Sequence, residues 1–302
     1  MLSIIICSKD EADLRRVSAN VADTVGVPFE IIATKNSGGK YGICEAYNLG
    51  AARSRYPYLC FMHEDVQVHT PGWGGRVAAY LADTSIGLVG VAGAAVRTRT
   101  PSPWYTSLPR YNYLNLIQHT AAGHRQHDYH NPDDAALADV VTVDGVWFCC
   151  RREVWQQHPF DAHTFRGFHF YDVDFASRLF TGGYRVCVAF DILIEHFSPG
   201  SYEREWIHYA LVYARKWRKK LPLAVPEVPQ TRWRRLEYES GKHFLGLLVK
   251  ANVKGGLLLR FGWQYLTGNP HGWTWGRSLK EKARTLLPTR YRYAGNEVQQ
   301  GR

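Results

Sequence analysis

The sequence predicts an α/β fold in which a mostly parallel sheet is flanked by helices and followed by a helical, basic C-terminal extension. Three observations lead to this prediction. Apolar, β-branched runs alternate with segments of helical spacing through the first two-thirds of the chain. Turn residues separate these segments. The charge then changes sign, because residues 1–203 contain 17 Lys+Arg and 21 Asp+Glu, whereas residues 204–302 contain 20 and 6.

The first third of the chain alternates regularly between strands and helices. Residues 2–7 are continuously apolar and suit a strand buried on both faces. Residues 11–25 carry Leu14, Val17 and Val21 at helical spacing. A strand, a helix and a strand follow at residues 29–34, 43–53 and 58–63. Because ligands of parallel α/β sheets bind at the carboxyl ends of the strands, we expect functional side chains directly after each strand.

The remaining elements are less regular. Strands are expected at 87–96, 140–150 and 184–190, and helices at 171–181 and 203–220. Residues 97–139 contain three prolines before position 110 and four of the 13 histidines, and are expected to be a long irregular stretch. The prolines at 222, 226 and 229 predict a hinge. We therefore expect an α/β domain at residues 1–205 and a helical, basic, Trp-rich extension at 206–302.

Length and composition argue against a membrane-spanning protein, a protein with a signal peptide and a protein stabilised mainly by disulfides. The chain has 302 residues, of which 45% are hydrophobic and 21% charged, as is typical of a globular protein. No apolar stretch reaches the roughly 20 residues that span a bilayer, and the N-terminus lacks the basic start and cleavage site of a signal peptide. The six cysteines contain no C-x-x-C pair. These features predict a protein of the reducing cytosol.

The first candidate site is His63, Glu64 and Asp65, at the end of a predicted apolar strand. Carboxylates in this place can hold Mg²⁺ or Mn²⁺ together with substrate phosphates. Acidic residues after a strand also commonly stabilise the next turn, and the spacing alone favours that simpler interpretation.

Two further candidates lie later in the chain. Asp172 and Asp174 stand among apolar residues such as Phe170 and Phe175, where burial can raise the pKa of a carboxyl and make it a general base. Either aspartate could instead cap the following helix, and one residue can do both. His196 follows a predicted strand and precedes a Gly/Ser turn, where it could bind a metal or a phosphate. A lone histidine is more often structural.

Seven segments together carry a resemblance to a known family. They are SIIICSKDE (3–11), AYNLGAARS (46–54), YLCFMHEDV (58–66), VVTVDGVWFCCRREVW (140–155), FDAHTFRGFHFYDVDFASRL (160–179), GYRVCVAF (183–190) and EHFSPGS (195–201). The chain resembles the family 2 glycosyltransferases, which have the Rossmann-like GT-A fold. More narrowly, it resembles the glycosyltransferase-like subfamily related to the streptomycin-biosynthesis StrF protein. The combination F-x-H-x-D-V, H-F-Y-D-V-D and H-x-x-x-G-S is the specific part.

The resemblance implies a role for each matching residue. Asp172 matches the catalytic base, and Asp65 and His196 match the residues that hold the metal on the donor diphosphate. His63 stands where the family's D-x-D motif has its first Asp, and Tyr171 replaces the Glu of its E-D motif; both are departures from the pattern. The residues implied to bind the nucleotide sugar are Ser8, Lys9, Asp10, Glu11, Asn36, His63, Glu64, Asp144, Gly145 and Asp174.

These roles imply an inverting sugar transfer that depends on Mn²⁺ or Mg²⁺. Departure of the nucleoside diphosphate develops negative charge, which a divalent ion neutralises. Asp172 would take a proton from the acceptor hydroxyl as its oxygen attacks the anomeric carbon from the opposite face. The expected donor is a nucleotide-diphosphate sugar, first of all a UDP-sugar. The expected acceptor is a glycan, a lipid-linked glycan or a metabolite of a bacterial biosynthetic pathway.

Two other functions stay open. A nucleotidyltransferase that makes sugar nucleotides would normally have a Gly-rich phosphate loop after the first strand, and CSKDE (7–11) lacks one. A catalytically silent sugar-nucleotide-binding or scaffold protein of the same fold is compatible with the departures at His63 and Tyr171.

The basic, Trp-rich extension lies outside the matched segments. Residues 243–266 mix Leu, Phe and Trp with Lys and Arg, which suits either a segment lying on an anionic membrane or a helical subdomain packed on the core. No nucleic-acid-binding motif is present beyond charge, so no nucleic-acid partner is expected. The predicted location is the cytoplasm, with peripheral attachment to the inner face of the cell membrane as an option.

Overall fold

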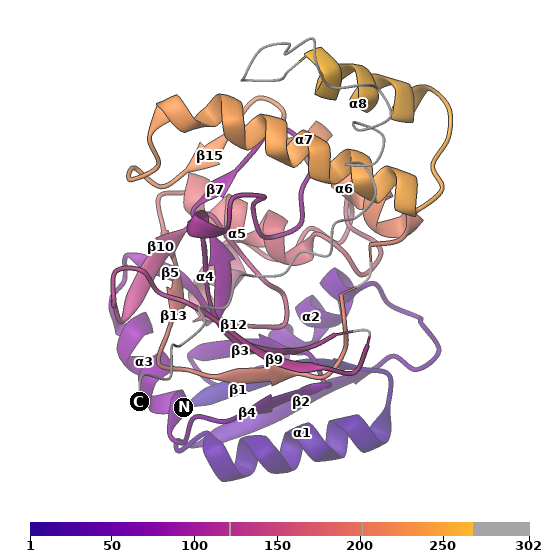
Figure 1. Ribbon diagram of the computed structural model, residues 1–302. Coiled ribbons are helices and arrows are strands. Elements are labelled where there is room, and N and C mark those ends of the chain that lie inside the picture. The colour runs from indigo at the N-terminus through magenta and orange to yellow at the C-terminus, as the bar shows by residue number, and fades with distance from the viewer. Residues whose placement is uncertain (121, 201, 268–302) are drawn as a thin grey trace, which may run out of the picture.

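A computed structural model describes residues 1–120, 122–200 and 202–267 of the protein (Figure 1). The larger of its two central sheets has the strand order β10-β13-β5-β12-β3-β1-β2. The smaller has the order β11-β6-β8-β14-β4, with β9 paired to β8, and a two-stranded sheet joins β15 to β7. The strands are β1 (Leu2–Ser8), β2 (Phe29–Lys35), β3 (Tyr58–Met62), β4 (Val66–Val68), β5 (Ile86–Gly90), β6 (Ala92–Ala94), β7 (Val96–Arg97), β8 (Asn112–His119), β9 (Arg125–His130), β10 (Leu137–Val140), β11 (Thr142–Val143), β12 (Trp147–Arg151), β13 (Arg185–Ala189), β14 (Ile194–His196) and β15 (Leu223–Ala224). The helices are α1 (Glu11–Thr24), α2 (Ile43–Ala52), α3 (Trp73–Ala82), α4 (Arg152–Gln157), α5 (Tyr171–Thr181), α6 (Arg204–Trp217), α7 (Trp233–Lys250) and α8 (Gly256–Thr267), with single 3₁₀ turns at Pro109–Tyr111 and Gln230–Arg232.

The larger sheet is covered on both faces, as predicted from its first strand. Strand β1 is buried along its whole length and pairs in parallel with β2 and β3. Because successive side chains of a strand point to opposite faces, Ile4 and Ile6 join the core beneath α1 and α3, whereas Ile5 joins the core beneath α2. The α/β architecture is therefore confirmed, but the larger sheet is mixed: in the described residues three of its strand pairs are parallel and three are antiparallel.

Two predicted strands are each broken into three. The segment 87–96 forms β5, β6 and β7, and the segment 140–150 contributes to β10, β11 and β12. The breaks arise because each segment leaves the larger sheet for the smaller one: β5 and β12 lie in the larger sheet, and β6 and β11 pair in the smaller. Strand β12 runs antiparallel to both β3 and β5, so the larger sheet is mixed at its centre.

The prediction of a long irregular stretch at 97–139 is wrong. Residues 112–119 and 125–130 form the antiparallel hairpin β8–β9, with cross-strand pairs from Leu114↔His130 to His119↔Arg125. Strand β9 (RQHDYH) has no apolar alternation, so the pairing with β8 stabilises it rather than a pattern of its own. Three of the four histidines of this stretch therefore lie on strands.

The prediction of a hinge at the proline-containing segment is also wrong. Leu221, Leu223 and Val225 are buried in the same core as α5 and α6, and β15 pairs with β7. Helix α7 packs on that core through Phe244 and Leu248, which are fully buried, and α8 lies at the opposite end of the molecule from α1 (Figure 1). The predicted domain division at 205/206 falls in the first turn of α6. Within the described ranges, the helices are too short or too polar to cross a membrane.

Candidate active site

The ends of β3 and β14 and the start of α5 meet at a cavity of about 420 Å³, a size typical of ligand sites. Five of the predicted site residues line it: His63, Asp144, Gly145, Asp172 and His196. Much of the remaining wall is aromatic and consists of Trp104, Tyr105, Phe168, Phe170, Tyr171, Tyr202 and Trp206. Among the described residues that line the cavity, none is Lys or Arg.

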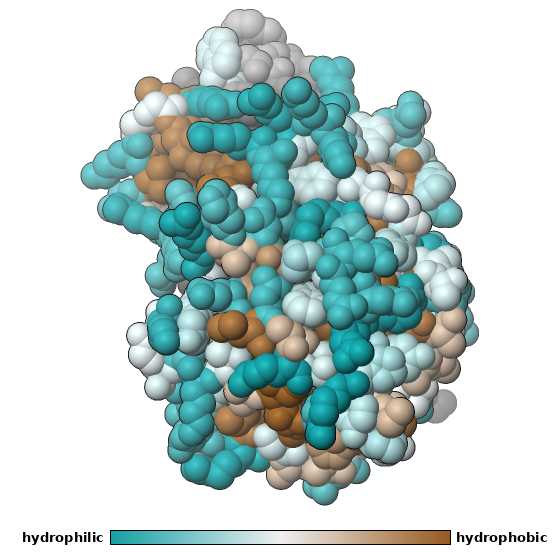
Figure 2. All heavy atoms as spheres, turned by 180° about the vertical axis from the view of Figure 1, so that it is seen from behind, coloured by the Kyte–Doolittle hydropathy of each residue, from teal (hydrophilic) through white to brown (hydrophobic). Residues whose placement is uncertain are grey.

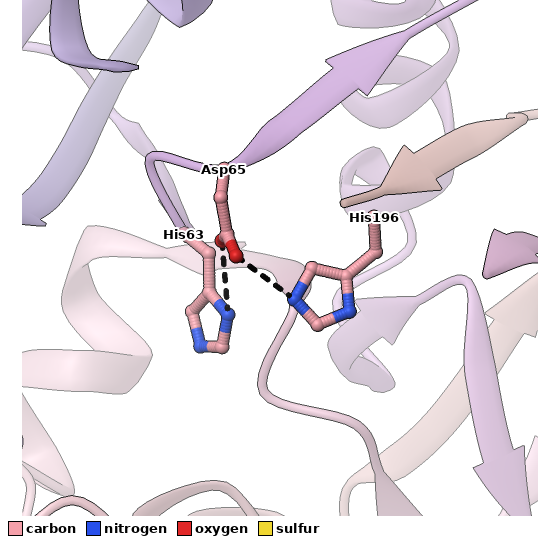
Figure 3. A group of neighbouring side chains, drawn as sticks. All are labelled: His63, Asp65 and His196. Carbon is pink, nitrogen blue, oxygen red and sulfur yellow. Dashed lines mark ion pairs between the residues drawn. The ribbon is translucent and has the colours of Figure 1, made fainter. Parts of the chain in front are cut away.

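Two histidines and an aspartate gather at one side of this cavity (Figure 3). His63 follows β3, Asp65 precedes β4 and His196 ends β14. The Oδ1 atom of Asp65 is 3.8 Å from His63 Nδ1, and its Oδ2 atom is 3.5 Å from His196 Nε2. One ligand atom from each residue lies within 4.8 Å of the other two. Strand β14 pairs antiparallel with β4, which brings His196 beside Val66 and so beside Asp65.

The hydrogen bonds of His63 orient its ring. The Tyr171 hydroxyl donates its single proton to the Gly145 carbonyl oxygen (3.0 Å) and lies 2.9 Å from His63 Nε2. The hydroxyl can therefore only accept from His63, so the proton of the neutral ring is on Nε2. Burial and the neighbouring His196 lower the pKa of His63 to about 4, so the ring is neutral at pH 7. Its Nδ1 lone pair is consequently directed toward Asp65.

The ring of His196 is oriented in the same way. The amide nitrogen of Gln118 donates to three backbone carbonyls, most closely to that of Ser198 at 2.6 Å. Its Oε1 atom then faces His196 Nδ1 at 3.1 Å and requires a proton there. The Nε2 atom of His196 is left to face Asp65, within 3.1 Å of the Ser198 hydroxyl. Neither histidine thus directs a proton at the carboxylate in this arrangement.

This donor set fits a divalent metal ion. Nitrogen lone pairs that converge on a carboxylate repel it unless a cation lies between them. Burial opposes ionisation of Asp65, but the side chains of His196, His63 and Ser198 around it hold the pKa of its carboxyl well below the usual value. The carboxylate is therefore available as a ligand at neutral pH. Two imidazoles and one carboxylate suit Mn²⁺ or another transition-metal ion better than Mg²⁺, which prefers oxygen ligands.

Asp172 lies in the first turn of α5 and faces Gly145. The backbone N–H of Gly145 donates to Asp172 Oδ2 at 2.8 Å. Burial, together with the nearby carboxylate of Asp144, raises the pKa of Asp172 to about 7. A Cβ atom at Gly145 would lie 2.0 Å from the Tyr171 hydroxyl oxygen, so only glycine allows this approach. Gly145 therefore contacts the Asp172 carboxylate through its N–H and, through the Tyr171 hydroxyl, the His63 ring.

The backbone before Asp172 is in a rare conformation. Phe170, which caps α5, has a φ angle of 66°, in the left-handed region that side chains other than glycine seldom adopt. Its ring packs on Trp206 and Tyr213 of α6, with centroid distances of 5.3 and 5.5 Å. The packing of α6 thus holds the turn that presents Tyr171 and Asp172 to the cavity.

Several predicted nucleotide-binding residues form a connected group at the ends of β1 and β3. The carboxylate of Glu64 accepts hydrogen bonds from the backbone N–H groups of Lys9 (2.8 Å) and Asp10 (3.2 Å). Asp10 caps α1. The Lys9 ammonium lies 4.5 Å from the centre of the Phe168 ring, which lines the cavity. Ser8 is buried at the end of β1, so the loop after this strand reaches the edge of the cavity.

Two other residues predicted to bind the nucleotide sugar, Asn36 and Glu11, do not line the cavity. The side-chain amide of Asn36 both donates to and accepts from the backbone of Tyr41, at 2.8 and 2.9 Å. Glu11 is exposed and pairs with Lys35 at 2.7 Å. The Asn36 amide is thus occupied within its own loop.

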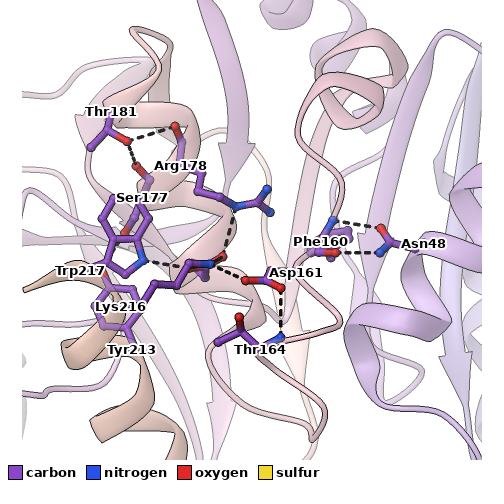
Figure 4. Close-up of polar contacts among 11 residues, drawn as sticks. Asn48, Phe160, Asp161, Thr164, Ser177, Arg178, Thr181, Tyr213, Lys216 and Trp217 are labelled. Carbon is purple, nitrogen blue, oxygen red and sulfur yellow. Dashed lines mark hydrogen bonds and ion pairs between the residues drawn. The ribbon is translucent and has the colours of Figure 1, made fainter. Parts of the chain in front are cut away.

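Asp174 is not in the lining of the cavity. Two residues along a helix correspond to a rotation of about 200°, so Asp172 and Asp174 project from nearly opposite sides of α5. The Asp174 carboxylate is buried and accepts from Trp217 Nε1 (2.8 Å), and it also pairs with Lys216 and Arg178. Lys216 in turn pairs with Asp161 at 2.7 Å (Figure 4). Asp174 therefore joins α5 to the last turn of α6.

Replacing Asp174 by Asn is expected to lower the free energy of unfolding by about 2 kcal/mol. The change keeps the volume of the side chain but removes the buried charge that the partly exposed cations Lys216 and Arg178 share. Denaturant unfolding followed by fluorescence would measure it. The control is Glu11→Gln, which removes an equally close but exposed ion pair and should leave the midpoint unchanged. Equal midpoints for all three proteins would contradict the expectation.

Several residues that complete the site could not be identified from the sequence. Gln118, which orients His196, lies in the stretch predicted to be irregular. Trp104 and Tyr105 line the cavity from the same stretch. Only their aromatic character, within a proline-rich segment between two strands, could have marked them. His63, assigned from the sequence to the nucleotide sugar, lies with the two predicted metal ligands.

Comparisons with known proteins bear on the family and the fold of the chain. The sequence model described as "Glycosyltransferase like family" matches residues 3–220. No curated protein sequence matches the chain. The structure is similar to a crystal structure of GalNAc-T7 with UDP, GalNAc and Mn²⁺, with a TM-score of 0.51 and 10% identity. That similarity covers 89% of this chain and 58% of the other, so the chain spans less than two-thirds of it. A mannosyltransferase, PcManGT from Pyrobaculum calidifontis in complex with GDP-Man and Mn²⁺, matches with a TM-score of 0.45, 13% identity and coverages of 94% and 77%.

At this level of identity, structural similarity bears on the fold alone, and it agrees with a GT-A architecture. The match of the family model is stronger, because it runs from the first residues of β1 to the end of α6 and includes every element that forms the cavity. On this basis the protein belongs to the glycosyltransferase-like family.

Proposed function

We propose that the protein is a metal-dependent, inverting glycosyltransferase that moves a sugar from a nucleotide-diphosphate sugar to an acceptor hydroxyl. One observation carries the proposal: the half-buried carboxylate of Asp172 and the rings of His63 and His196 line the same cavity, with Asp65 beside both rings. Gly145 joins the two sides, because it contacts Asp172 directly and His63 through Tyr171. The proposal includes membership of family 2 and of the StrF-related subfamily, which the F-x-H-x-D-V and H-F-Y-D-V-D segments support.

The charges around the cavity support dependence on a metal ion. A nucleoside diphosphate is strongly anionic, yet no Lys or Arg occurs among the described residues of the lining, and Lys9 lies only at its edge. His63 Nδ1, the Asp65 carboxylate and His196 Nε2 would hold the ion, with Mn²⁺ preferred to Mg²⁺. When bound, the ion would offset the negative charge that develops on the departing diphosphate.

Asp172 would act on the acceptor. Its carboxylate takes the proton of the acceptor hydroxyl while the acceptor oxygen forms a bond to the anomeric carbon. The bond from that carbon to the diphosphate oxygen breaks, and the diphosphate leaves with the electron pair. A single displacement from the face opposite the leaving group inverts the configuration. The Gly145 N–H holds the carboxylate in place, and the aromatic wall excludes water.

The pH dependence of the reaction is expected to follow the ionisation of Asp172. A base works only when deprotonated, and the pKa of this carboxyl is raised to about 7. The value of kcat/KM should therefore rise about tenfold per pH unit well below 7 and level off above it. Initial rates of nucleoside diphosphate release at saturating Mn²⁺ would measure the profile. A profile that is flat between pH 5 and 8 would contradict the assignment.

A donor screen tests the proposal as a whole. The purified protein would be incubated with UDP-, dTDP- and GDP-sugars, with Mn²⁺, Mg²⁺ or EDTA, and with glycan and lipid-linked glycan acceptors. Metal-dependent release of the nucleoside diphosphate, with UDP-sugars as the first expected donors, would support it. Binding of a nucleotide sugar without turnover on any acceptor would favour a catalytically silent binding protein. Absence of both would refute the site assignment.

The proposal also covers the chemical class of the acceptor and the cellular location of the reaction. A glycan or lipid-linked glycan of a bacterial polysaccharide or glycosylated metabolite suits a cavity with aromatic walls, because sugar rings stack on aromatic side chains. We place the reaction in the cytoplasm, where nucleotide sugars are made.

A further inference from the structure

The C-terminal end of α6 carries a concentrated positive surface. Two adjoining hollows share Arg215 and Arg218. One extends to the end of the helix and the other to α8 and the loop after β7. Their exposed cationic side chains, called the basic groove below, are Arg99, Arg215, Arg218, Lys219, Lys220 and Arg260.

The charges of the basic groove have no acidic partner in the part of the chain that the structure describes. None of the six residues forms an ion pair with another residue in the described ranges, and neither hollow has a described Asp or Glu in its lining. Lys216 and Arg178 border the same hollow but differ, because Asp161 and Asp174 pair with them. Six unpaired cations this close together repel one another, so the groove favours a polyanionic partner.

An apolar surface accompanies this charge. Leu211, Leu221, Leu257 and Phe261 line the hollow shared with α8. On α8 itself, Leu259 is 74% exposed and Trp263 is 69% exposed. Figure 2 shows an apolar area in the region of α8, framed by hydrophilic side chains. Exposed leucine beside arginine suits the boundary between lipid headgroups and acyl chains, whereas a nucleic acid offers leucine no apolar partner.

We propose that the basic groove and the exposed residues of α8 bind the surface of an anionic phospholipid bilayer. The six cations would contact lipid phosphates, and Leu259 and Trp263 would insert at the acyl-chain boundary. This surface lies at the end of the molecule opposite α1 (Figure 1). Helix α6 runs from Trp206 in the cavity wall to Arg218, about 18 Å along its axis at 1.5 Å per residue.

Vesicle co-sedimentation of the full chain tests the proposal without any sugar nucleotide, so its outcome is independent of the proposed transfer reaction. Binding is expected to vesicles of phosphatidylcholine mixed with phosphatidylglycerol, to weaken with added salt and to be weak for phosphatidylcholine alone. The pair Arg215→Glu and Arg218→Glu should reduce the partition coefficient at least about 25-fold, about fivefold for each cation removed. Leu259→Ser with Trp263→Ser should also reduce it.

The matched control is Arg15→Glu with Arg16→Glu, which makes the same change in net charge on exposed α1. These variants should bind the mixed vesicles as the unchanged protein does. Equal losses for the two charge-reversed pairs would overturn the proposal, since they would indicate net charge rather than a surface. Equal binding to both vesicle types, or tighter binding to single-stranded RNA than to mixed vesicles, would also overturn it. Binding of inorganic phosphate at millimolar concentration, with no binding to either vesicle type, would indicate a soluble phosphate ligand and would also overturn the proposal.

Discussion

A loss of about 10²–10⁴-fold in the rate of sugar transfer is expected when Asp172 is replaced by Asn, the range that general-base catalysis contributes. The amide has nearly the same shape and can still accept the hydrogen bond from Gly145, but it cannot take a proton. Binding of the nucleotide sugar should be unchanged. Single-turnover release of nucleoside diphosphate, with donor affinity from calorimetry, would separate the two effects.

Stability should not account for that loss. The pKa of Asp172 is raised from 3.8 to about 7 on folding, so its ionisation costs stability as the pH rises through this interval. The Asn variant should therefore unfold at a temperature no lower than the unchanged protein at neutral pH. Asp174→Asn is the matched control on the same helix: it should lose stability but keep the transfer rate of the folded protein. A rate for Asp172→Asn within about threefold of the unchanged protein would rule out the base assignment.

The second large effect is expected on Mn²⁺ binding by the proposed ligands His63, Asp65 and His196. Asp65→Asn removes the only carboxylate of the donor set in the described residues and should weaken Mn²⁺ binding at least about 100-fold, with a matching loss of transfer. Tyr171→Phe keeps all three donors but removes the hydroxyl that fixes the His63 ring, and should weaken Mn²⁺ binding about 10-fold to 100-fold. Calorimetric titration with MnCl₂ alone would measure both without relying on activity.

Asp128→Asn provides the control for the metal titration. Asp128 is a half-buried carboxylate that lines the same cavity from β9 but lies outside the donor set. Its variant should bind Mn²⁺ as the unchanged protein does. If Asp65→Asn kept full affinity, or if Asp128→Asn lost as much, the ion would be held elsewhere and the assignment of the three donors would be wrong.

The helices and strands that could be predicted were those with a clear local pattern of apolar residues. The apolar run 2–7 indicates a strand that is buried on both faces, and β1 forms there. The helical spacing of 11–25 indicates a helix with one apolar face, and α1 forms there. Helix 171–181 was predicted to the residue. The strands at 87–96 and 140–150 were harder, because a strand that changes sheet keeps the same apolar pattern across the break. Strand β9 has no such pattern at all.

The sequence by itself determined the α/β fold, the order of its main elements and, through the resemblance of its motifs, the residues Asp65, Asp172 and His196 as candidates for metal binding and catalysis. Tertiary structure alone decided which side chains meet. Pairing of β14 with β4 places His196 at Asp65, and the turn at Phe170 aims Tyr171 at His63 and Asp172 at Gly145. The helical rotation between Asp172 and Asp174 sends the second carboxylate to α6 instead of the cavity. These contacts join residues 27 to more than 100 positions apart, and their geometry depends on strand register and helix orientation, which no local pattern encodes.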